Sequence, residues 1–189
     1  MSGSEERQAP TRGLAFLAKS QLMTSNDVDR ALTRMAHEII ERNHSVDSLT
    51  IVGLQSGGRE IATNLARLLS DISGQVVMAA MLDVSFYRDD LPRNPLLASA
   101  STTIDQDLTD RTVVVVDDVL FTGRTIRAAL NALSDWGRPR AIQLCVLVDR
   151  GHRELPIRPD FVGKNLPTSR DEAIVATLDG VWIGSRGVS

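Results

Sequence analysis

The clearest pattern of apolar and polar positions lies over residues 25–43. Apolar side chains recur there at the spacing of one helix face, while the opposite face is polar. Ser25 or Asn26 can cap the start of this helix. The pattern predicts a helix over Ser25–Asn43, with a buried face formed by Val28, Ala31, Leu32, Met35 and Ile39.

Uniformly apolar runs of strand length alternate with further helical patterns. The runs are Leu49–Leu54, Val76–Leu82, Thr112–Val116 and Ala141–Val148, with shorter β candidates at Phe161–Val162, Ala173–Leu178 and Val181–Ile183. Helical patterns follow the first run, up to Gly74, and the third, over Thr125–Trp136. Strands without alternation are typical of parallel sheets covered on both faces. We therefore expect an α/β fold with a central, mainly parallel sheet and right-handed crossovers.

The remaining segments set the domain limits. Residues 1–20 are expected to form a disordered tail, and residues 21–189 one domain. A long polar stretch, about residues 83–110, is predicted to be a functional flap or disordered.

The composition of the chain argues against several classes of site and of protein. The lone cysteine, Cys145, excludes an internal disulfide and a Cys-rich metal site, and its apolar neighbours predict a buried, inert thiol. A net charge of −3 does not favour a general nucleic-acid binder. No apolar stretch approaches the roughly 20 residues of a membrane span, and residues 1–11 lack the apolar core of a signal peptide. We expect a cytoplasmic protein without membrane contact.

Candidate chemistry gathers after the third strand. Asp117 and Asp118 follow four valines, and neighbouring carboxylates at a strand end can accept bonds from ribose hydroxyls or help to hold Mg²⁺. Gly123 lets successive N–H groups converge on an anion, with hydroxyls from Thr122 and Thr125. The next helix directs its positive end to the same place. The segment thus predicts a sugar-phosphate site, and it matches neither a Walker loop nor a dinucleotide fingerprint.

Residues 113–125 closely resemble the phosphoribosyl pyrophosphate (PRPP) motif of type I phosphoribosyltransferases. The segments 148–158 and 163–169, together with 86–90 and 34–43, are similar to the PyrR family of pyrimidine operon attenuation regulators within that superfamily. The resemblance covers about Leu22–Leu178. It implies a type I phosphoribosyltransferase fold with a flexible flap and a small hood.

The resemblance also implies two activities: synthesis of UMP and pyrophosphate from uracil and PRPP with Mg²⁺, and UMP-dependent binding of pyrimidine operon mRNA leaders. Asp117 and Asp118 would hold the ribose hydroxyls and contribute to a Mg²⁺ site, with Arg88 of the flap on the phosphates. Ser56 and Gly57 would form the pyrophosphate loop, and Arg150 and Ile174 would lie at the base. The 5′-phosphate would lie against Val119, Leu120, Phe121, Thr122, Gly123, Arg124 and Thr125.

Displacement at the anomeric carbon passes through an oxocarbenium-like state and needs positioning and charge stabilisation rather than a protein nucleophile. One segment departs from the family pattern. The pyrophosphate loop usually contains Thr-Arg-Gly, whereas Ser56-Gly57-Gly58 stands here, as Gly-Gly does in other phosphoribosyltransferases.

The net charge of the chain does not favour RNA binding, but the distribution of charge along the chain does. Residues 138–170 contain seven Arg or Lys residues against three acidic ones, and phosphate contacts need such clusters. With the resemblance, the expected RNA contacts are Thr33, Arg34, His37, Arg42, His152, Arg153, Arg158, Lys164 and Thr168.

Three hypotheses remain open from the sequence. The first is the bifunctional protein, assembled as a homodimer or larger homo-oligomer. The second, motivated by Gly57, is an RNA-binding regulator that senses UMP with little catalysis. The third is a phosphoribosyltransferase for another base without an RNA role.

Overall fold

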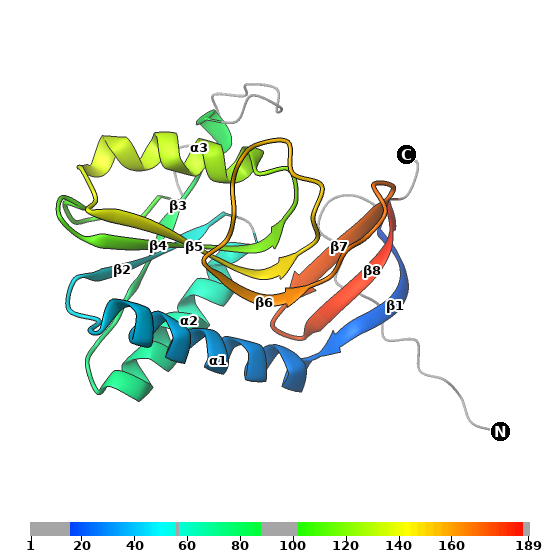
Figure 1. The fold of residues 1–189 in the computed structure, drawn as a ribbon, viewed down its shortest axis with the longest axis horizontal. Helices are drawn as coiled ribbons and strands as arrows, with labels where there is room; N and C mark the ends of the chain where they lie inside the picture. Colours follow the sequence, from blue (N-terminus) through cyan, green and yellow to red (C-terminus); the bar gives the residue numbers. More distant parts are fainter. Residues whose placement is uncertain (1–15, 56, 88–101, 187–189) are drawn as a thin grey trace.

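Five parallel strands form the central sheet, in the order β3-β2-β4-β5-β6 (Figure 1). Their bounds are β2 Leu49–Leu54, β3 Ala79–Leu82, β4 Thr112–Leu120, β5 Ala141–Asp149 and β6 Phe161–Asn165. The computed structural model describes residues 16–55, 57–87 and 102–186. The predicted α/β architecture with a parallel sheet is confirmed.

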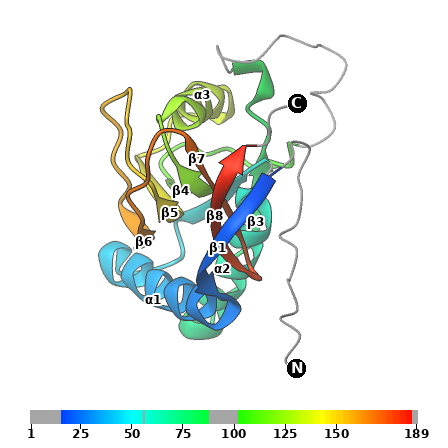
Figure 2. The ribbon, with the colours of Figure 1, turned by 90° about the vertical axis from the view of Figure 1, so that its right-hand side faces the viewer.

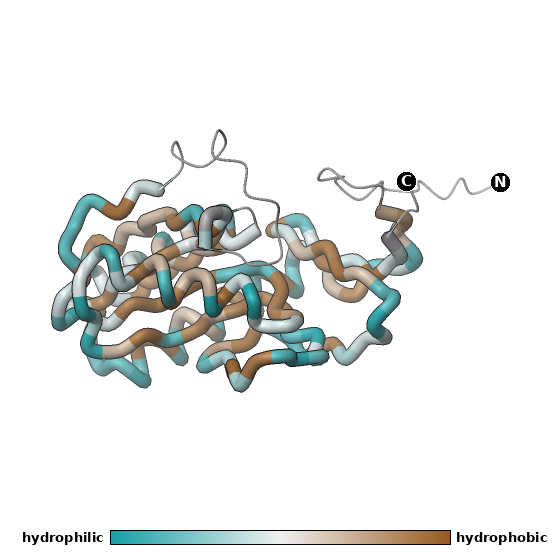
Figure 3. Tube along the Cα trace, turned by 90° about the horizontal axis from the view of Figure 1, so that it is seen from above, coloured by the Kyte–Doolittle hydropathy of each residue, from teal (hydrophilic) through white to brown (hydrophobic). Residues whose placement is uncertain are grey.

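Helices cover both faces of this sheet. Helices α1 (Ser25–Asn43) and α2 (Gly58–Ser73) lie on one face and α3 (Arg124–Leu133) on the other (Figure 1); single 3₁₀ turns occupy Ser85–Tyr87 and Ser134–Trp136. Strand β4 contributes side chains to the cores on both faces of the sheet, because successive side chains of a strand point to opposite faces. Val114 and Val116 belong to the core under α1 and α2, and Val113 and Val115 to the core under α3. Along the trace, hydrophobic stretches are separated by hydrophilic ones (Figure 3).

A second, three-stranded antiparallel sheet packs beside the first, in the order β1-β8-β7 (Figure 2). It consists of β1 (Phe16–Thr24), β7 (Glu172–Thr177) and β8 (Gly180–Arg186). The expectation of a disordered tail over residues 1–20 is therefore wrong for residues 16–20. Most side chains of β1 are exposed, and its partner β8 lies at the other end of the sequence, so neither a periodic pattern nor a local contact marks it. Residues 1–15 lie outside the described residues.

Several helix and strand features differ from those predicted. Strand β3 begins at Ala79, not Val76; Val76 and Met78 are 89% and 79% exposed. The Ser70 hydroxyl accepts a hydrogen bond from the N–H of Val77 (2.9 Å) and so fastens this segment to α2 before it enters the sheet. Helix α1 has the predicted bounds, but its N-cap is Thr24 rather than Ser25 or Asn26.

Part of the polar stretch 83–110 is ordered. Ile104 and Leu108 are buried, and the N–H of Thr103 donates to the carbonyl of Met81 on the outer side of β3. Residues 88–101 of the predicted flap lie outside the described residues. The prediction for Cys145 is confirmed, because the side chain is completely buried in β5 and burial raises the pKa of its thiol far above the ordinary value.

Candidate functional site

The predicted site lies where the order of the central sheet reverses. From β2 the chain crosses through α2 to β3 on one side, and from β4 it crosses through α3 to β5 on the other. At such a switch point the loops leave the strand ends in opposite directions and open a crevice in which ligands bind in parallel α/β sheets. The loop after β2 contains Gly57, and the end of β4 contains Asp117 and Asp118.

The two carboxylates lie inside β4 rather than after it, because the strand continues to Leu120. Asp117 pairs with Val146 of β5 and is 6% exposed, while Asp118 is half-buried. One oxygen of Asp117 accepts the N–H of Asp118 (3.0 Å), and one oxygen of Asp118 accepts the N–H of Val119 (2.8 Å). The backbone thus holds both carboxylates in place at the crevice.

The loop after β2 contacts β4 so closely that two glycines are required. A Cβ on Gly57 would lie 1.9 Å from a carboxylate oxygen of Asp118, and one on Gly58 would lie 2.2 Å from the carbonyl oxygen of Val116. At Gly57 the obstacle is a side chain, while at Gly58 it is backbone. The departure from the family's Thr-Arg-Gly therefore has a local consequence: the Asp118 carboxylate occupies the space that a side chain at position 57 would need.

Both helices that begin at this crevice lack a side-chain cap. Gly123, with φ 91°, is the N-cap of α3, and Gly57 is the N-cap of α2. The left-handed conformation at Gly123 is the one the sequence predicted, and it is easily adopted only by glycine. The first N–H groups of a helix need partners from outside, and phosphate oxygens are suitable ones. Two such helix starts can bind phosphate groups at the two ends of one ligand.

We call residues 120–125 the phosphate loop and residues 150–158 the basic loop. The basic loop joins β5 to β6 and arches beside α3 (Figure 1). The N–H groups of Arg150 and Glu154 donate to the carbonyls of Leu120 (3.1 Å) and Thr122 (3.0 Å). Arg153 donates to the carbonyl of Phe121 (2.9 Å). The two loops therefore form one hydrogen-bonded unit.

A salt bridge adds a fourth link between the two loops. The Nε of Arg124 lies 2.8 Å from a carboxylate oxygen of Glu154. Sequence reasoning missed Glu154, because the two partners are 30 positions apart and no motif spacing connects them.

Arg150 stands behind the phosphate loop. It is 4% exposed, its guanidinium lies 4.1 Å from the centre of the Phe121 ring, and it donates to the Thr168 hydroxyl (3.0 Å) and the Ser169 carbonyl (2.9 Å). The Ser169 N–H in turn lowers the pKa of Glu172 at the start of β7. Arg150 thus connects the phosphate loop to the segment that leads into β7, the strand of Ile174.

The structure separates the predicted RNA contacts into two groups. On α1, Thr33, Arg34, His37 and Arg42 are exposed. Arg34 donates to the carbonyls of Val162 (2.9 Å) and Gly163 (2.8 Å), so α1 and β6 form one surface, to which exposed Lys164 also belongs.

The second group lies in or against the basic loop. Arg158 is exposed, whereas His152 and Thr168 are partly buried. Arg153 is directed inward: it pairs with Asp149 (2.5 Å) and donates to three carbonyls, those of Phe121, Gly151 and Ile157. Its position therefore fits a structural role better than a direct phosphate contact. Ser56 and Arg88, which the sequence also singled out, lie outside the described residues.

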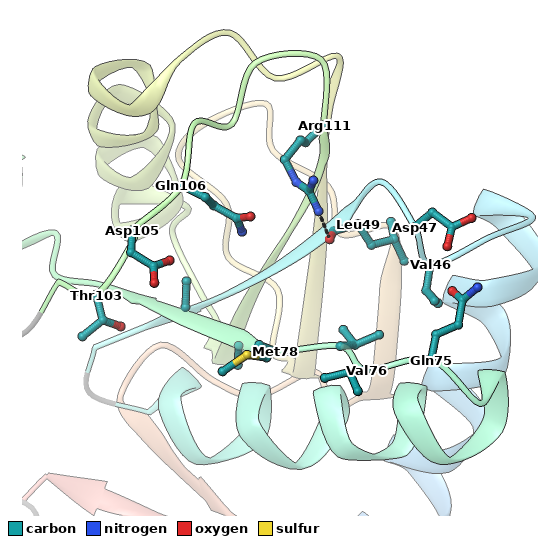
Figure 4. A pocket seen from close by; sticks show the side chains of 13 residues that line it. Val46, Asp47, Leu49, Gln75, Val76, Met78, Thr103, Asp105, Gln106 and Arg111 are labelled. Carbon is teal, nitrogen blue, oxygen red and sulfur yellow. Dashed lines mark hydrogen bonds between the residues drawn. The ribbon is translucent and has the colours of Figure 1, made fainter.

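A cavity of about 740 Å³ lies at the opposite end of the sheet (Figure 4). Its wall combines the exposed Val76 and Met78 with Asp105, Gln106 and Arg111, and Arg111 donates to the carbonyl of Leu49 (2.8 Å). This cavity lies at the amino ends of the strands and contains neither the carboxylate pair nor an uncapped helix start. Size alone therefore does not locate the site.

The described residues contain no group of three or more His, Cys, Asp or Glu side chains arranged to hold a metal ion. Mg²⁺ requires less from the protein, since one or two carboxylates together with substrate phosphates are a usual set of ligands. Asp117 and Asp118 fit that smaller role. In the described part of the chain no helix is long and apolar enough to cross a bilayer.

Comparison with known proteins agrees with this geometry. Residues 19–178 match the family model described as the phosphoribosyl transferase domain. A relative from Roseiflexus sp. (strain RS-1), named "Bifunctional protein PyrR", is 53% identical over 91% of this chain and 94% of its own length. A protein of the same name from Leifsonia xyli is 54% identical over 82% and 88% of the two chains. The chain belongs to the PyrR family of phosphoribosyltransferases.

Solved structures confirm the fold expected for a PyrR protein. The hypoxanthine phosphoribosyltransferase of Trypanosoma cruzi superposes with a TM-score of 0.70 at 17% identity, covering 90% of this chain and 98% of that one. The enzyme of the same name from Staphylococcus aureus gives 0.68 at 17% identity, covering 90% and 92%. At these identities the likeness establishes the type I phosphoribosyltransferase fold, and the family assignment comes from the PyrR relatives.

Proposed function

We propose that the protein transfers the ribose 5-phosphate group of PRPP to uracil, forming UMP and pyrophosphate, and that the same nucleotide site controls RNA binding. The observation that carries the proposal is the switch point of the sheet, where a carboxylate pair stands between two helix starts without side-chain caps. Two phosphate positions with hydroxyl acceptors between them match PRPP, which has a phosphate at one end and a pyrophosphate at the other.

The transfer would need no nucleophile from the protein. The N–H groups at the start of α3 would hold the 5′-phosphate, and Asp117 and Asp118 would accept hydrogen bonds from the ribose hydroxyls. The start of α2 would bind the pyrophosphate as negative charge develops on it, and Mg²⁺ supplies further charge neutralisation when it enters with PRPP. Fixed donors aimed at developing charge account for most of the rate enhancement in such sites.

Uracil is expected between the phosphate loop and β7. Phe121, supported from behind by Arg150, offers a wall at the end of β4. Ile174 lies on β7 and packs partly against the core. We infer that the base lies near these residues, with hydrogen bonds to the backbone around Ile174.

The RNA surface would be formed by the exposed cations of α1 and β6 and by Arg158. Arg34 and Arg42 reach the β6 side of the molecule, where Arg42 also pairs with Asp160 (2.8 Å). Exposed Arg and His side chains can bind phosphates and stack on unpaired bases. We propose that this surface binds the leader of a pyrimidine operon mRNA, in a symmetric assembly of identical chains.

The control by UMP would act through the links between the two loops. A phosphate bound at the phosphate loop orders Phe121, Thr122 and Arg124, and these residues hold Arg153 and Glu154 of the basic loop. A ligand that favours one arrangement of the unit shifts the whole unit toward it. UMP binding would therefore order the basic loop for RNA.

The direct test of catalysis is to measure UMP and pyrophosphate formed from uracil and PRPP, with hypoxanthine and cytosine as alternative bases. The proposal predicts UMP formation that requires Mg²⁺, and no product with the other bases. UMP binding without turnover would instead support the regulator that only senses UMP, the hypothesis motivated by the departure of Gly57 from the family's Thr-Arg-Gly. Product with another base would support the third hypothesis.

A further inference from the structure

A small cavity lies between the basic loop, the end of β5 and β6. Its volume is about 270 Å³, and its lining comes from the end of β5, from the basic loop and from β6. The lining residues are Asp149, Arg153, Ile157, Arg158, Pro159, Val162 and Asn165. Drug-sized ligands occupy pockets of about 300–1,000 Å³, so this cavity has room for one small group of the size of a nucleobase.

The inner wall of the cavity is fixed and electrically compensated. Asp149 accepts the N–H of Gly151 (3.0 Å) with one oxygen and pairs with Arg153 (2.5 Å) through the other. Arg153 further donates to the carbonyls of Phe121 and Ile157. Because this cation is already paired, a free inorganic anion gains little by entering the cavity.

The remaining wall suits a flat ligand with apolar faces and a polar edge. Ile157, Pro159 and Val162 contribute apolar surface. Asn165 and Arg158 are exposed at the mouth, and neither side chain makes a hydrogen bond or ion pair with the described part of the chain. An amide offers both a donor and an acceptor, which is what the hydrogen-bonding edge of a nucleobase requires.

Basic side chains outnumber acidic ones around the cavity, where Arg34 also pairs with Glu38 (2.6 Å) and Arg42 with Asp160 (2.8 Å). Lys164 lies one position before Asn165 on β6, and Arg34 reaches the same strand from α1 through the carbonyls of Val162 and Gly163. Cations around a small, partly apolar cavity are the arrangement needed to hold a nucleic acid backbone while one base enters. Sequence-specific RNA recognition generally uses such unstacked bases.

We propose that this cavity is a nucleobase subsite, which takes one unpaired base of the bound RNA and contacts the edge of that base through Asn165. The inference rests on the RNA binding proposed above. In this proposal Asn165 and Val162 discriminate between RNA sequences, and neither residue was among the RNA contacts predicted from the protein sequence. Attraction of the RNA backbone comes from Arg158, Lys164 and the cations of α1.

The test compares Asn165→Leu and Val162→Phe with the wild-type protein, in saturating UMP and over a series of salt concentrations. The probes are the leader transcript of the pyrimidine operon and a fully paired RNA duplex of equal length. Loss of one recognised base predicts about ten-fold weaker binding of the leader. Affinity for the duplex, the salt dependence and UMP synthesis stay unchanged.

Arg158→Ala is the matched control for a phosphate contact. It is expected to weaken binding of both RNAs and to reduce the slope of log K against log salt by about one. Because residue 165 is exposed, Asn165→Leu should fold normally. It therefore keeps the test decisive if Val162→Phe does not fold.

Each outcome decides between the two proposals. Leader binding by both variants at wild-type affinity overturns the nucleobase subsite, and so does an equal loss for leader and duplex with a changed salt slope. Failure of the wild-type protein to bind the leader at all overturns the proposed RNA function, and the subsite with it.

Discussion

The start of helix α1 differs from the starts of α2 and α3. At α1, Thr24 and Asp27 form a complete capping box: the Thr24 hydroxyl accepts the N–H of Asp27 (3.3 Å), and the Asp27 carboxylate accepts the N–H of Thr24 (2.9 Å). At α2 and α3 the N-caps are Gly57 and Gly123, and no side chain forms a cap.

The difference indicates that the start of α1 contributes to stability, whereas the starts of α2 and α3 are suited to ligand binding. A capping box satisfies the first N–H groups of a helix from within the protein, whereas a glycine N-cap leaves them available to a ligand. Of the three α-helices in the described residues, the two uncapped ones begin at the carboxyl edge of the central sheet, beside Asp117 and Asp118. Substitutions at the α1 start should therefore change stability alone, and substitutions at the crevice should change activity first.

The largest effect is expected for Asp118→Asn. Loss of the charge removes an acceptor for the ribose hydroxyls and a potential Mg²⁺ partner, so UMP synthesis should fall by at least about 100-fold, the usual effect of removing one electrostatic group in an active site. Steady-state assay of UMP formation measures this, with thermal unfolding as the check on folding. Asp105→Asn, in the larger cavity at the other end of the sheet, is the matched control and should keep wild-type activity. Equal activities of the two variants would contradict the assignment.

The next largest effect on activity is expected for substitution of Gly57, whereas substitution of Gly58 in the same loop should mainly lower stability. In Gly57→Ala the new Cβ displaces the Asp118 carboxylate, and UMP synthesis should fall about 10- to 100-fold with little change in melting temperature. In Gly58→Ala the Cβ meets the backbone carbonyl of Val116, so about 1–3 kcal/mol of unfolding free energy should be lost. Activity assays and denaturant unfolding of both variants test the contrast, which fails if Gly57→Ala is fully active.

A smaller effect is expected for Glu154→Gln, which breaks the salt bridge to Arg124 across the two loops. Both side chains are about one third exposed, and such pairs contribute at most about 1 kcal/mol. The factor by which UMP tightens RNA binding should therefore shrink by about two- to five-fold, with UMP synthesis nearly unchanged. Asp71→Asn, which breaks the exposed Arg67–Asp71 pair on α2, should leave the UMP response intact. An unchanged response in Glu154→Gln would show that this link carries no coupling.

The smallest effect is expected at the α1 start. Thr24→Ala should lower the melting temperature by about 2–4 °C without changing UMP synthesis. Hydrogen bonds from the hydroxyl and the N–H of Thr24 lower the pKa of Asp27 from its ordinary value of 3.8 to about 2. A carboxylate with a lowered pKa stabilises the fold above its unfolded pKa, so the part of the difference that comes from the bond of the Thr24 hydroxyl to the Asp27 carboxylate should be complete above a pH of about 4 and be lost as the pH falls through about 2. The part that comes from the N–H of Asp27 on the Thr24 hydroxyl should remain at low pH. Melting curves over that pH range measure both parts, and a pH-independent difference would contradict the contribution of the ionised Asp27 carboxylate.

The sequence predicted best what is determined locally. Helix α1 has the expected bounds because a capping box lies at its start and because Asn43 at its end donates to the carbonyl of Ile39. The Gly123 turn was also predictable, since few residues other than glycine adopt that φ. Strand β1 was missed because its pairing with β8 joins opposite ends of the chain.

The candidate site shows the same limit. Sequence motifs located Asp117, Asp118 and the phosphate loop, but they did not show that Asp118 occupies the space beside Gly57. Counting charges also did not show that Arg153 of the basic loop is directed to Asp149 and to backbone carbonyls. Such partners depend on how distant segments meet, which charge patterns along the chain do not contain.

The central claim is that one nucleotide site serves both synthesis and control. The most direct test is a paired titration: the affinity for the leader RNA with and without saturating UMP, and the affinity for UMP with and without the RNA. The account predicts tighter binding in both experiments by the same factor, since coupling between two sites is reciprocal. An RNA affinity that does not respond to UMP would contradict it.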